Sequence, residues 1–411
     1  MTFFKKLNKI LSLPVIWIIR IYQYTLSPDK WLPSFWLKGR ICSHEPHCSK
    51  YSINVLKRYG FRPGMFYAAD RVLHCTASMH KHYDPAQYKI VFFSSAPIGV
   101  PFLEALAQDK RFEVVGVVTQ CDKPSGRWME MSENIIKKEA KKLFAWCSEN
   151  FIATPTKLNP EKPAPFGATG SEEGKKFAER LKEKEPDMIV VIAYGKIIPQ
   201  SILDIPKIAP INIHGSLLPK YRGASPIQTT LLNNDKETGI TIMKMDATMD
   251  TGNMIDILRF RIPFERTTKE LIEEMMKIGP KFLNTTLRKY GKKLLGEVPQ
   301  QEHKATYCGK IEKESWLIDP RSDSITTIYN KYRAFALRPK IYFSLKPKAE
   351  SGKPIRVIIE HLKLNEPLYN SNDEVPLFKG KELHPAVIDI QLKPEGKKTM
   401  SRKEFLNWYM K

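Results

Sequence analysis

The clearest structural signal in this chain is Ile211-Asn-Ile-His-Gly-Ser-Leu-Leu-Pro-Lys-Tyr-Arg-Gly223, an apolar run with two polar side chains that leads into a loop. Side chains alternate across a β-strand, so Asn212 and His214 are expected on one face and the two isoleucines on the other. The run reads as a parallel strand that stops at the first glycine. Both polar groups therefore lie at its carboxyl end, where open α/β sheets place their functional sites.

The segments around this strand alternate between apolar runs typical of buried strands and apolar residues at helical spacing. Strand patterns occur at 89–93, 113–119, 188–193, 239–245 and 254–262, and helical patterns at 100–108, 134–142, 175–184, 224–232 and 268–289. Such alternation predicts βαβ units and a mainly parallel sheet covered by helices on both faces. Residues 160–174 contain three prolines and three glycines, so we expect an exposed loop there.

Both ends of the chain differ from this middle section in residue composition and in their pattern of apolar residues. Residues 1–87 are rich in aromatic, cysteine and histidine residues and read as helical. Short strand patterns at 341–345, 355–359 and 387–392, separated by turn residues, predict a mainly β domain at the other end. The predicted fold class is therefore α/β, with a small helical unit at 1–87, a central domain at 88–297 and a C-terminal β domain at 298–411.

Length and composition limit the class of protein. At about 150 residues per domain, 411 residues suggest two to four domains, and 42% hydrophobic with 27% charged residues exclude a disordered tail or a fibre. The net charge of +22 favours a polyanionic partner such as nucleic acid or an anionic membrane. The excess lies mostly at the ends, with +9 in residues 1–87 and +7 in residues 301–411 against +6 in the 213 residues between them.

Common motifs for phosphate and metal chemistry are missing. The sequence holds no GxGxxG, GxxxxGK[ST], HExxH or CxxC, so dinucleotide, P-loop and usual zinc sites lose their support. Six cysteines in 411 residues are too sparse for a disulfide scaffold, and we interpret them as thiols of a reducing compartment.

The first twenty residues combine lysines with an apolar run and imitate a secretory signal, but no small-residue cleavage site follows. Nine apolar residues cover only about 14 Å as a helix, against a hydrocarbon core of about 30 Å. Two interpretations stay open for this segment. It forms either a basic helix in the lipid headgroup region or an amphipathic helix packed on the protein with solvated lysines.

A second loop supplies acidic side chains to the predicted sheet edge. Asp246 and Asp250 follow the strand pattern at 239–245, so Asp250 can converge with Asn212 and His214. Such a set can perform acyl transfer, because Asn donates to a carbonyl oxygen that gains charge, His shuttles a proton, and Asp orients the imidazole and accepts a proton from an amine. Taken alone, however, Asn-x-His is more typical of a turn residue and a satisfied, partly buried histidine.

Longer segments remove this ambiguity. They are Val190-Val-Ile-Ala-Tyr-Gly-Lys-Ile-Ile-Pro199, 211–223, Ala224-Ser-Pro-Ile-Gln228, Glu237-Thr-Gly-Ile-Thr-Ile-Met243, Met249-Asp-Thr-Gly-Asn253, Ala305-Thr-Tyr307 and Gly396-Lys-Lys-Thr-Met-Ser401. With them, residues 88–411 resemble the methionyl-tRNA formyltransferases. The resemblance implies transfer of a formyl group from 10-formyltetrahydrofolate to the methionyl amino group of initiator methionyl-tRNA. It also implies a Rossmann-like formyltransferase catalytic domain followed by an OB-like β-barrel that binds tRNA.

The resemblance also assigns roles to single residues. Asn212, His214 and Asp250 fall on the family's catalytic positions, and Arg127 falls in its tRNA-facing loop. The family's folate-contacting loop and a neighbouring pocket loop correspond to Ser216, Leu217, Leu218 and Pro219, and to Tyr194 and Gly195. No metal is implied.

Three segments depart from the family pattern. Ser94-Ser-Ala-Pro97 replaces the usual Gly-Thr-Pro-type loop after the first strand, which puts the local turn in question. Arg127 is kept, but Trp128-Met-Glu-Met131 replaces the basic residues that usually follow, which predicts weaker contacts with the tRNA acceptor end. The insertion at 160–174 has no role in the family.

A different set of segments marks residues 1–87. They are Arg20-Ile-Tyr-Gln23, Ser27-Pro28, Cys42, Pro46-x-Cys48-Ser49-x-Tyr51, Gly60, Gly64, Arg71-Val-Leu-His-Cys75 and Asp84-Pro85. These resemble the membrane protein insertion efficiency factors. That resemblance implies a cytoplasmic protein attached peripherally to the inner face of the cell membrane, with an anionic membrane surface and the membrane insertion machinery as partners. Cys42, Cys48 and Cys75 with nearby histidines could also ligate zinc, but the Cys-x5-Cys spacing favours packed thiols.

The sequence therefore predicts a fusion of an insertion-factor unit with a complete formyltransferase. One alternative is formyl transfer to another amine, on a sugar nucleotide or on glycinamide ribonucleotide, through the same three residues. The basic β domain favours tRNA, since a small substrate needs no such platform. The other alternative is a primary membrane-insertion role with a degenerate enzyme portion, and the intact Asn212, His214 and Asp250 argue against it.

Overall fold

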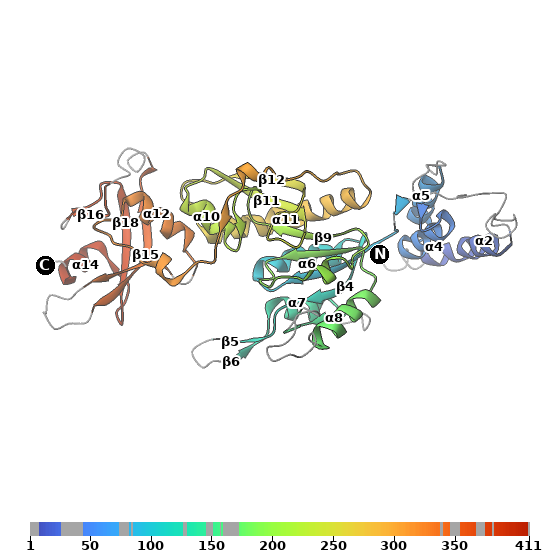
Figure 1. Cartoon of the computed structure of the whole chain (residues 1–411), viewed down its shortest axis with the longest axis horizontal. Coiled ribbons are helices and arrows are strands. Elements are labelled where there is room, and N and C mark those ends of the chain that lie inside the picture. The colour runs from blue at the N-terminus through green and yellow to red at the C-terminus, as the bar shows by residue number, and fades with distance from the viewer. Residues whose placement is uncertain are drawn as a thin grey trace. The chain divides into compact units, whose positions relative to one another are not determined.

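The computed structural model describes residues 8–25, 44–73, 82–83, 85–125, 130–144, 151–156, 158, 172–337, 340–345, 354–366, 375–379 and 382–409. The chain forms two compact units, coloured along the sequence in Figure 1. Unit 1 comprises residues 1–89, 109–113 and 287–295, and unit 2 comprises 90–108, 114–286 and 296–411. The predicted C-terminal domain and most of the predicted central domain therefore belong to one unit.

Unit 1 is helical, as predicted. Within residues 1–87, its described elements are the helices α2 (Ser12–Thr25), α4 (Cys48–Tyr59) and α5 (Phe61–Leu73) and the short parallel strands β1 (His44–Glu45) and β2 (His82–Tyr83). Ile16 of α2 packs against Ile53 and Leu56 of α4. Helix α4 ends at Gly60, whose φ of 78° suits glycine. A Cβ on Gly64 would lie only 2.7 Å from the backbone of Leu56, so α4 and α5 pack closely.

Unit 2 is built on a sheet whose described strands are β3 (Tyr88–Ser94), β4 (Phe112–Val118), β7 (Phe151–Ala153), β8 (Met188–Ile192), β9 (Ala209–His214), β11 (Glu237–Lys244) and β12 (Met254–Arg261). These strands follow the order β12-β11-β9-β8-β3-β4-β7. The pairs β3–β8, β8–β9 and β4–β7 are parallel, whereas β11 runs antiparallel to β9 and β12. The strand order reverses between β3 and β8, which is where open α/β sheets bind ligands.

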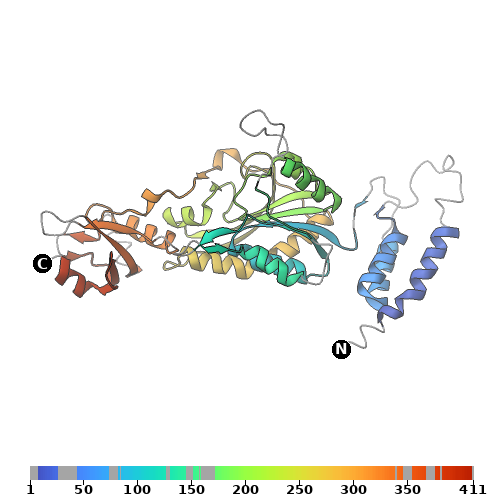
Figure 2. The same cartoon turned by 90° about the horizontal axis from the view of Figure 1, so that it is seen from below.

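Helices lie on both faces of this sheet (Figure 2). They are α6 (Val100–Gln108), α7 (Ile135–Leu143), α8 (Glu172–Glu183), α9 (Gln200–Leu203), α10 (Pro226–Leu232) and α11 (Thr268–Gly291). Phe177 and Leu181 of α8 belong to one apolar cluster with Val91 and Val191 of the strands. Gly279 of α11 lies so close to Phe102 and Ile240 that any side chain there would collide. The mainly parallel, doubly covered sheet is therefore confirmed.

The predicted loop at 160–174 needs one correction. Helix α8 begins at Glu172, three residues before its predicted start, so the end of the predicted loop is helical. Glu172 and Glu173 in the first turn suit the positive end of the helix dipole. These two residues favour a helix start at this point, although the prolines and glycines before them favoured a loop. Residues 160–171 lie outside the described residues.

The C-terminal part of unit 2 carries a second sheet. Its described strands β14 (Tyr342–Leu345), β15 (Ile355–Leu364), β18 (Val387–Pro394) and β19 (Met400–Ser401) pair in that order, and every pair is antiparallel. The helices α12 (Ile325–Ala334) and α14 (Arg402–Tyr409) accompany it, and β16 (Phe378–Lys379) pairs with β17 (Glu382–Leu383). The predicted fold class is confirmed, although the strand patterns gave no sign of α12.

The two sheets of unit 2 are joined through a shared apolar core. Leu231, Ile262 and Leu271 of the first part belong to the same buried cluster as Ile328 and Phe343 of the second. Hydrogen bonds reinforce this junction, since the buried Arg333 donates to the side-chain oxygen of Asn234 at 2.9 Å and to the backbone oxygen of Phe264 at 3.1 Å. Removal of the C-terminal part would therefore expose part of the core of the first.

Candidate active site

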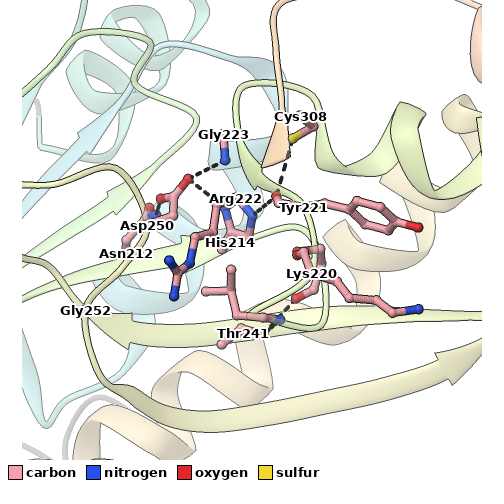
Figure 3. A network of polar contacts seen from close by, with 12 residues as sticks. Asn212, His214, Lys220, Tyr221, Arg222, Gly223, Thr241, Asp250, Gly252 and Cys308 are labelled. Atoms are coloured by element: carbon pink, nitrogen blue, oxygen red, sulfur yellow. Dashed lines mark hydrogen bonds and ion pairs between the residues drawn. The ribbon is translucent and has the colours of Figure 1, made fainter. Parts of the chain in front are cut away.

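The polar residues predicted at the sheet edge meet there. Asn212 and His214 end β9, opposite Met243 and Thr241 of β11, and Asp250 lies in the loop between β11 and β12. His214 is buried with 5% of its surface exposed, and Asn212 is half-buried. Figure 3 shows both side chains on the side of the strand that faces Asp250.

Three groups surround the carboxylate of Asp250. Its Oδ1 accepts a hydrogen bond from Asn212 Nδ2 at 3.1 Å, and its Oδ2 accepts one from the backbone N–H of Gly223 at 2.8 Å. His214 Nδ1 lies 3.6 Å from the same Oδ2. Asp250 has a φ of 56°, a left-handed conformation that residues other than glycine rarely adopt. The carboxylate is thus held in one orientation by groups from two other segments.

The proton positions on His214 follow from its partners. Nε2 lies 2.8 Å from the backbone oxygen of Tyr221, which can only accept, so Nε2 carries a proton and donates it. The remaining ring nitrogen, Nδ1, faces the Asp250 carboxylate. Because the first nitrogen is committed to the backbone, Nδ1 is the atom through which His214 can take up or release a proton.

The loop predicted to contact folate is tied to the sheet. Ser216 Oγ donates to the backbone oxygen of Lys220 at 2.6 Å, and the buried Thr241 hydroxyl donates to Ser216 O at 2.7 Å and accepts from Leu218 N at 3.1 Å. The Leu218–Pro219 peptide bond is cis. Ser216 and Leu218 are buried, so Leu217 and Pro219 are the partly exposed members of this loop.

The second predicted pocket loop follows β8. The ring of Tyr194 is buried edge-on against Phe93, with ring centres 5.3 Å apart, and this burial raises the pKa of its hydroxyl. Its backbone oxygen accepts a hydrogen bond from Gln120 Nε2 at 2.7 Å. Gly195 is exposed and has a φ of 76°, the left-handed region that glycine tolerates. Tyr194 can therefore serve the site through its backbone, while Gly195 presents open surface.

Ser95 links the loops after three strands, although its segment departs from the family pattern. Its N–H donates to Ala193 O at 3.3 Å, its hydroxyl accepts from Gln120 N at 3.0 Å, and its backbone oxygen accepts from Asn134 Nδ2 at 3.2 Å. The unusual Ser-Ser turn thus has a structural role. No sequence pattern pointed to Gln120 and Asn134, because they lie 25 and 39 residues from Ser95 and only the fold brings them together.

A segment beyond the first sheet also borders the site. The strand β10 (Arg222–Gly223) pairs in parallel with β13 (Tyr307–Cys308), and Cys308 Sγ lies 3.3 Å from Tyr221 O (Figure 3). The guanidinium of Arg222 is buried and donates to Glu302 and Gln300. The sequence contains Arg222 within the quoted motif, but no pattern pointed to Gln300 or Glu302 as its partners.

Two titratable groups beside the site keep their protons near neutral pH. Burial raises the pKa of Tyr221 to about 12, and its hydroxyl donates to Asp235 at 2.8 Å and accepts from Asn233 at 3.0 Å. Burial also raises the pKa of the Cys308 thiol. Neither group can therefore serve as a proton acceptor in a reaction at neutral pH.

Other predicted residues lie outside the described part of the chain. They include Arg127, between the paired strands β5 (Lys123–Ser125) and β6 (Glu130–Ser132), and also Cys42 and Cys75. Cys48 is partly buried and is not in a disulfide. Among the residues that are described, no three metal-ligating side chains come together.

Helix α2 of unit 1 uses two faces. Ile16 is buried against α4, whereas Leu13, Trp17 and Tyr24, which share another face at helical spacing, are 61%, 67% and 77% exposed. Arg20 lies on that exposed face as well. Helix α2 thus packs on the protein, as one of the two interpretations predicted, and it leaves an exposed face with apolar residues and Arg20. Binding of this face to lipid headgroups stays a prediction. None of the described helices is both long and apolar enough to cross a membrane.

Comparison with protein families divides the chain into matching segments. Residues 88–287 match the family described as formyl transferase, and residues 310–409 match the formyl transferase C-terminal domain. Residues 11–87 match the family of membrane protein insertion efficiency factors.

Individual relatives agree with the family matches. The methionyl-tRNA formyltransferase of Methylacidiphilum infernorum is 35% identical over 275 residues, which cover 66% of this chain and 80% of the relative. That of Caldicellulosiruptor saccharolyticus is 34% identical over 324 residues, 78% of this chain and 96% of the relative. Among solved structures, an N-formyltransferase of Helicobacter canadensis in complex with folinic acid and dTDP-3-aminofucose is 17% identical at a TM-score of 0.45, covering 68% of this chain and 88% of that one.

Proposed function

The chain belongs to the methionyl-tRNA formyltransferases, and on this basis we propose that it transfers the formyl group of 10-formyltetrahydrofolate to the methionyl amino group of initiator methionyl-tRNA. One observation carries the proposal. Asn212, His214 and the Asp250 carboxylate meet at the end of β9. They supply the hydrogen-bond donor, the proton carrier and the proton acceptor that acyl transfer to an amine requires.

The folate donor has a flat conjugated ring that needs both apolar surface and backbone polar groups. The loops at the reversal of strand order offer both, since Gly195 is exposed and Ile197 beside it is 80% exposed, while Leu217 and Pro219 are partly exposed. These residues fit the donor, and we assign its binding to Tyr194, Gly195 and the Ser216–Pro219 loop. When bound, the folate supplies a formyl carbon carried on nitrogen.

Asn212 stabilises the charge that develops on the formyl oxygen. Its amide carries two N–H groups, of which one donates to Asp250 Oδ1. The other can donate to a carbonyl oxygen as that oxygen becomes negative. Because Asp250 already fixes the amide plane, the donor is oriented before substrate arrives, which is how such groups lower a barrier.

Asp250 and His214 move the proton. As the methionyl nitrogen forms its bond to the formyl carbon it must lose a proton, and the Asp250 carboxylate accepts it. His214 Nδ1, 3.6 Å from that carboxylate, takes up this proton and passes it to the folate nitrogen as the bond between that nitrogen and the formyl carbon breaks. No side-chain nucleophile of the protein takes part.

The tRNA is assigned to the C-terminal domain at 298–411 together with Arg127. The excess charge of +7 in residues 301–411 suits a phosphate backbone. Lys397 and Lys398 are exposed in the turn between β18 and β19, where a backbone could reach them. This platform favours a tRNA substrate over a small amine.

The N-terminal unit at 1–87 makes the chain a fusion of two families. We assign to it attachment to the cytoplasmic face of the cell membrane and assistance to membrane protein insertion. The exposed face of α2 supports the attachment, because Leu13 and Trp17 can enter the headgroup region while Arg20 pairs with anionic lipid.

The enzymatic proposal is tested by substrate choice. The purified chain is supplied with 10-formyltetrahydrofolate and, in separate reactions, methionyl initiator tRNA, an amino-sugar nucleotide or glycinamide ribonucleotide. Formylation of the tRNA with a kcat/KM at least about a hundredfold above that of either small amine is expected. Preferential formylation of a small amine would overturn the assignment of the substrate.

A further inference from the structure

The connection between the two sheets of unit 2 forms one wall of the active site. Residues 300–309 run beside the loop that carries Tyr221 and Arg222, with Arg222 paired to Tyr307 and Gly223 to Cys308. Backbone bonds join Arg222 N to Thr306 O at 2.8 Å and Ala224 N to Cys308 O at 3.0 Å. The chain thus passes the catalytic groups on its way to the C-terminal domain.

Within this wall, Gln300 reaches the loop that carries Asp250. It is 8% exposed, and its Nε2 donates to the backbone oxygens of Asp250 and Gly252, both at 2.8 Å. Asp250 has the left-handed backbone conformation described above, which needs support from its surroundings. Two hydrogen bonds from one amide hold the backbone on both sides of Thr251, immediately behind the catalytic carboxylate.

Arg222 determines which way the Gln300 amide points. Its Nε donates to Gln300 Oε1 at 3.0 Å, and an arginine can only donate, so the amide nitrogen must face the two backbone oxygens. Arg222 is itself fixed by Glu302, through bonds of 2.9 and 2.7 Å from its two terminal nitrogens. Its side chain is fully buried, so this pairing leaves the guanidinium little freedom.

We propose that Gln300, oriented by Arg222, is a positioning residue for formyl transfer that holds the Asp250 loop so that the carboxylate meets Asn212 and His214. The proposal rests on the catalytic role assigned above to Asp250. It gives the segment between the domains a part in the chemical step, through the position of the Asp250 carboxylate. A residue that acts through Asp250 affects turnover, whereas a residue that only stabilises the fold affects the amount of active enzyme.

The decisive variant is Gln300→Glu in the full chain. The carboxylate keeps the shape of the side chain and its bond with Arg222, but it presents an oxygen instead of an N–H to the Asp250 and Gly252 carbonyls. We expect kcat to fall at least about tenfold while KM for folate and for tRNA changes by less than about threefold, because both binding surfaces lie elsewhere. The matched control is Gln301→Glu, the same change at an exposed neighbouring position, for which kcat should match that of the wild type.

Kinetics are measured per folded active site, with circular dichroism and thermal unfolding as fold checks. Wild-type kcat in a folded Gln300→Glu variant would overturn the proposal. If that variant does not fold, Glu302→Gln tests the proposal instead. The Glu302 side chain is 69% exposed, so this change weakens the hold on Arg222 without altering the core. It should lower kcat about two- to fivefold at unchanged KM, and an unchanged kcat would overturn the proposal. Asp250→Ala is measured in parallel, and if it retains full activity, the assigned role of Asp250 fails rather than the positioning role alone.

Discussion

Asn212 donates its side-chain amide to the carboxylate of Asp250 across 3.1 Å, although 38 residues separate the two in sequence. Each residue fixes the other, since the carboxylate sets the plane of the amide and the amide occupies one carboxylate oxygen. No single strand or turn contains both residues, so local structure alone cannot form this hydrogen bond. The relationship depends on the sheet register, on the left-handed backbone at Asp250 and on the N–H of Gly223 that holds the second oxygen.

The role of Asp250 as proton acceptor predicts a large effect of Asp250→Asn. The amide keeps the size of the side chain but cannot take a proton from the attacking amine, so kcat should fall by at least about 10²-fold. Asp246→Asn is the matched control in the same loop, where the carboxylate is exposed and bonds to Thr248 and Thr251. Steady-state formylation of methionyl-tRNA measures both, and equal activity of the two variants would exclude the assigned role.

His214 is expected to act through Nδ1 rather than through its shape. In His214→Gln the side-chain amide can still donate to Tyr221 O but provides no titratable nitrogen, so kcat should fall about 10²-fold. His361→Gln, at a partly exposed position on β15, serves as control and should keep normal turnover. Single-turnover formyl transfer reports the chemical step directly. Near-wild-type turnover in His214→Gln would show that His214 takes no part in proton transfer and that Asp250 is the only one of the two residues that does.

Recognition of tRNA by the C-terminal domain is best tested by point changes, because the two sheets share a core that a deletion would expose. Lys397→Gln with Lys398→Gln removes two exposed charges from the β18–β19 turn. If both contact phosphates, KM for tRNA should rise and the slope of log KM against log salt should fall by about two. Folate KM should stay within about threefold of the wild type.

The control for this pair is Lys292→Gln with Lys293→Gln, two adjacent exposed lysines beyond the end of α11. They carry the same charge in a different part of the chain. An equal loss of tRNA affinity in both pairs would indicate that net charge matters and that the C-terminal turn has no specific contact.

Membrane attachment through α2 predicts that Trp17→Glu weakens binding to anionic vesicles. Trp17 is 67% exposed on the face that also carries Arg20, so a carboxylate there opposes both insertion and lipid charge. Co-sedimentation should show binding of the wild type that high salt releases, and a several-fold loss in the variant. Ile388→Glu, at a 58% exposed position on β18, should sediment like the wild type. An equal loss of vesicle binding in both variants would show that any added surface charge reduces sedimentation and that α2 has no specific role.

Tyr221 predicts a defined dependence of stability on alkaline pH. Its pKa of about 12 in the folded state exceeds the ordinary value of 10, so the unfolded chain loses the phenolic proton first. The stabilisation is complete below pH 10 and is lost as pH rises towards 12. Tyr221→Phe has no phenolic proton and therefore lacks this pH-dependent stabilisation. It also loses the hydrogen bonds to Asp235 and Asn233, and the loss of these bonds should lower the free energy of unfolding by about 1–2 kcal/mol at neutral pH.

Urea unfolding of wild type and Tyr221→Phe at pH 8, 10 and 11 measures this difference, which should shrink as pH rises. Tyr24→Phe, at a position that is 77% exposed, provides the comparison and should differ little from the wild type throughout. A difference between wild type and Tyr221→Phe that stays constant up to pH 11 would show that Tyr221 ionises as easily in the folded protein as in the unfolded chain.

Local patterns predicted the sheet and most of its helices well. The expected helix at 100–108 is α6 (Val100–Gln108), and the expected run at 211–214 is the end of β9. Such elements follow from side-chain periodicity, which the order of residues fully specifies. Helix α12 was missed although Ile325, Ile328 and Tyr329 stand at helical spacing, because the helix has only ten residues and lies among short strand patterns.

The sequence by itself determined the chemistry available to this protein: the two family segments, the excess of positive charge at both ends, and the placement of Asn212 and His214 on one face of a strand. Tertiary structure alone decided how these groups act. Gly223 N–H, Gln300 and Arg222 reach Asp250 from 27, 50 and 28 residues away, the first two by direct hydrogen bonds and Arg222 through Gln300. The reason is physical, because alternation along a strand is a local property, whereas the orientation of a carboxylate depends on donors that only chain folding brings within 3 Å.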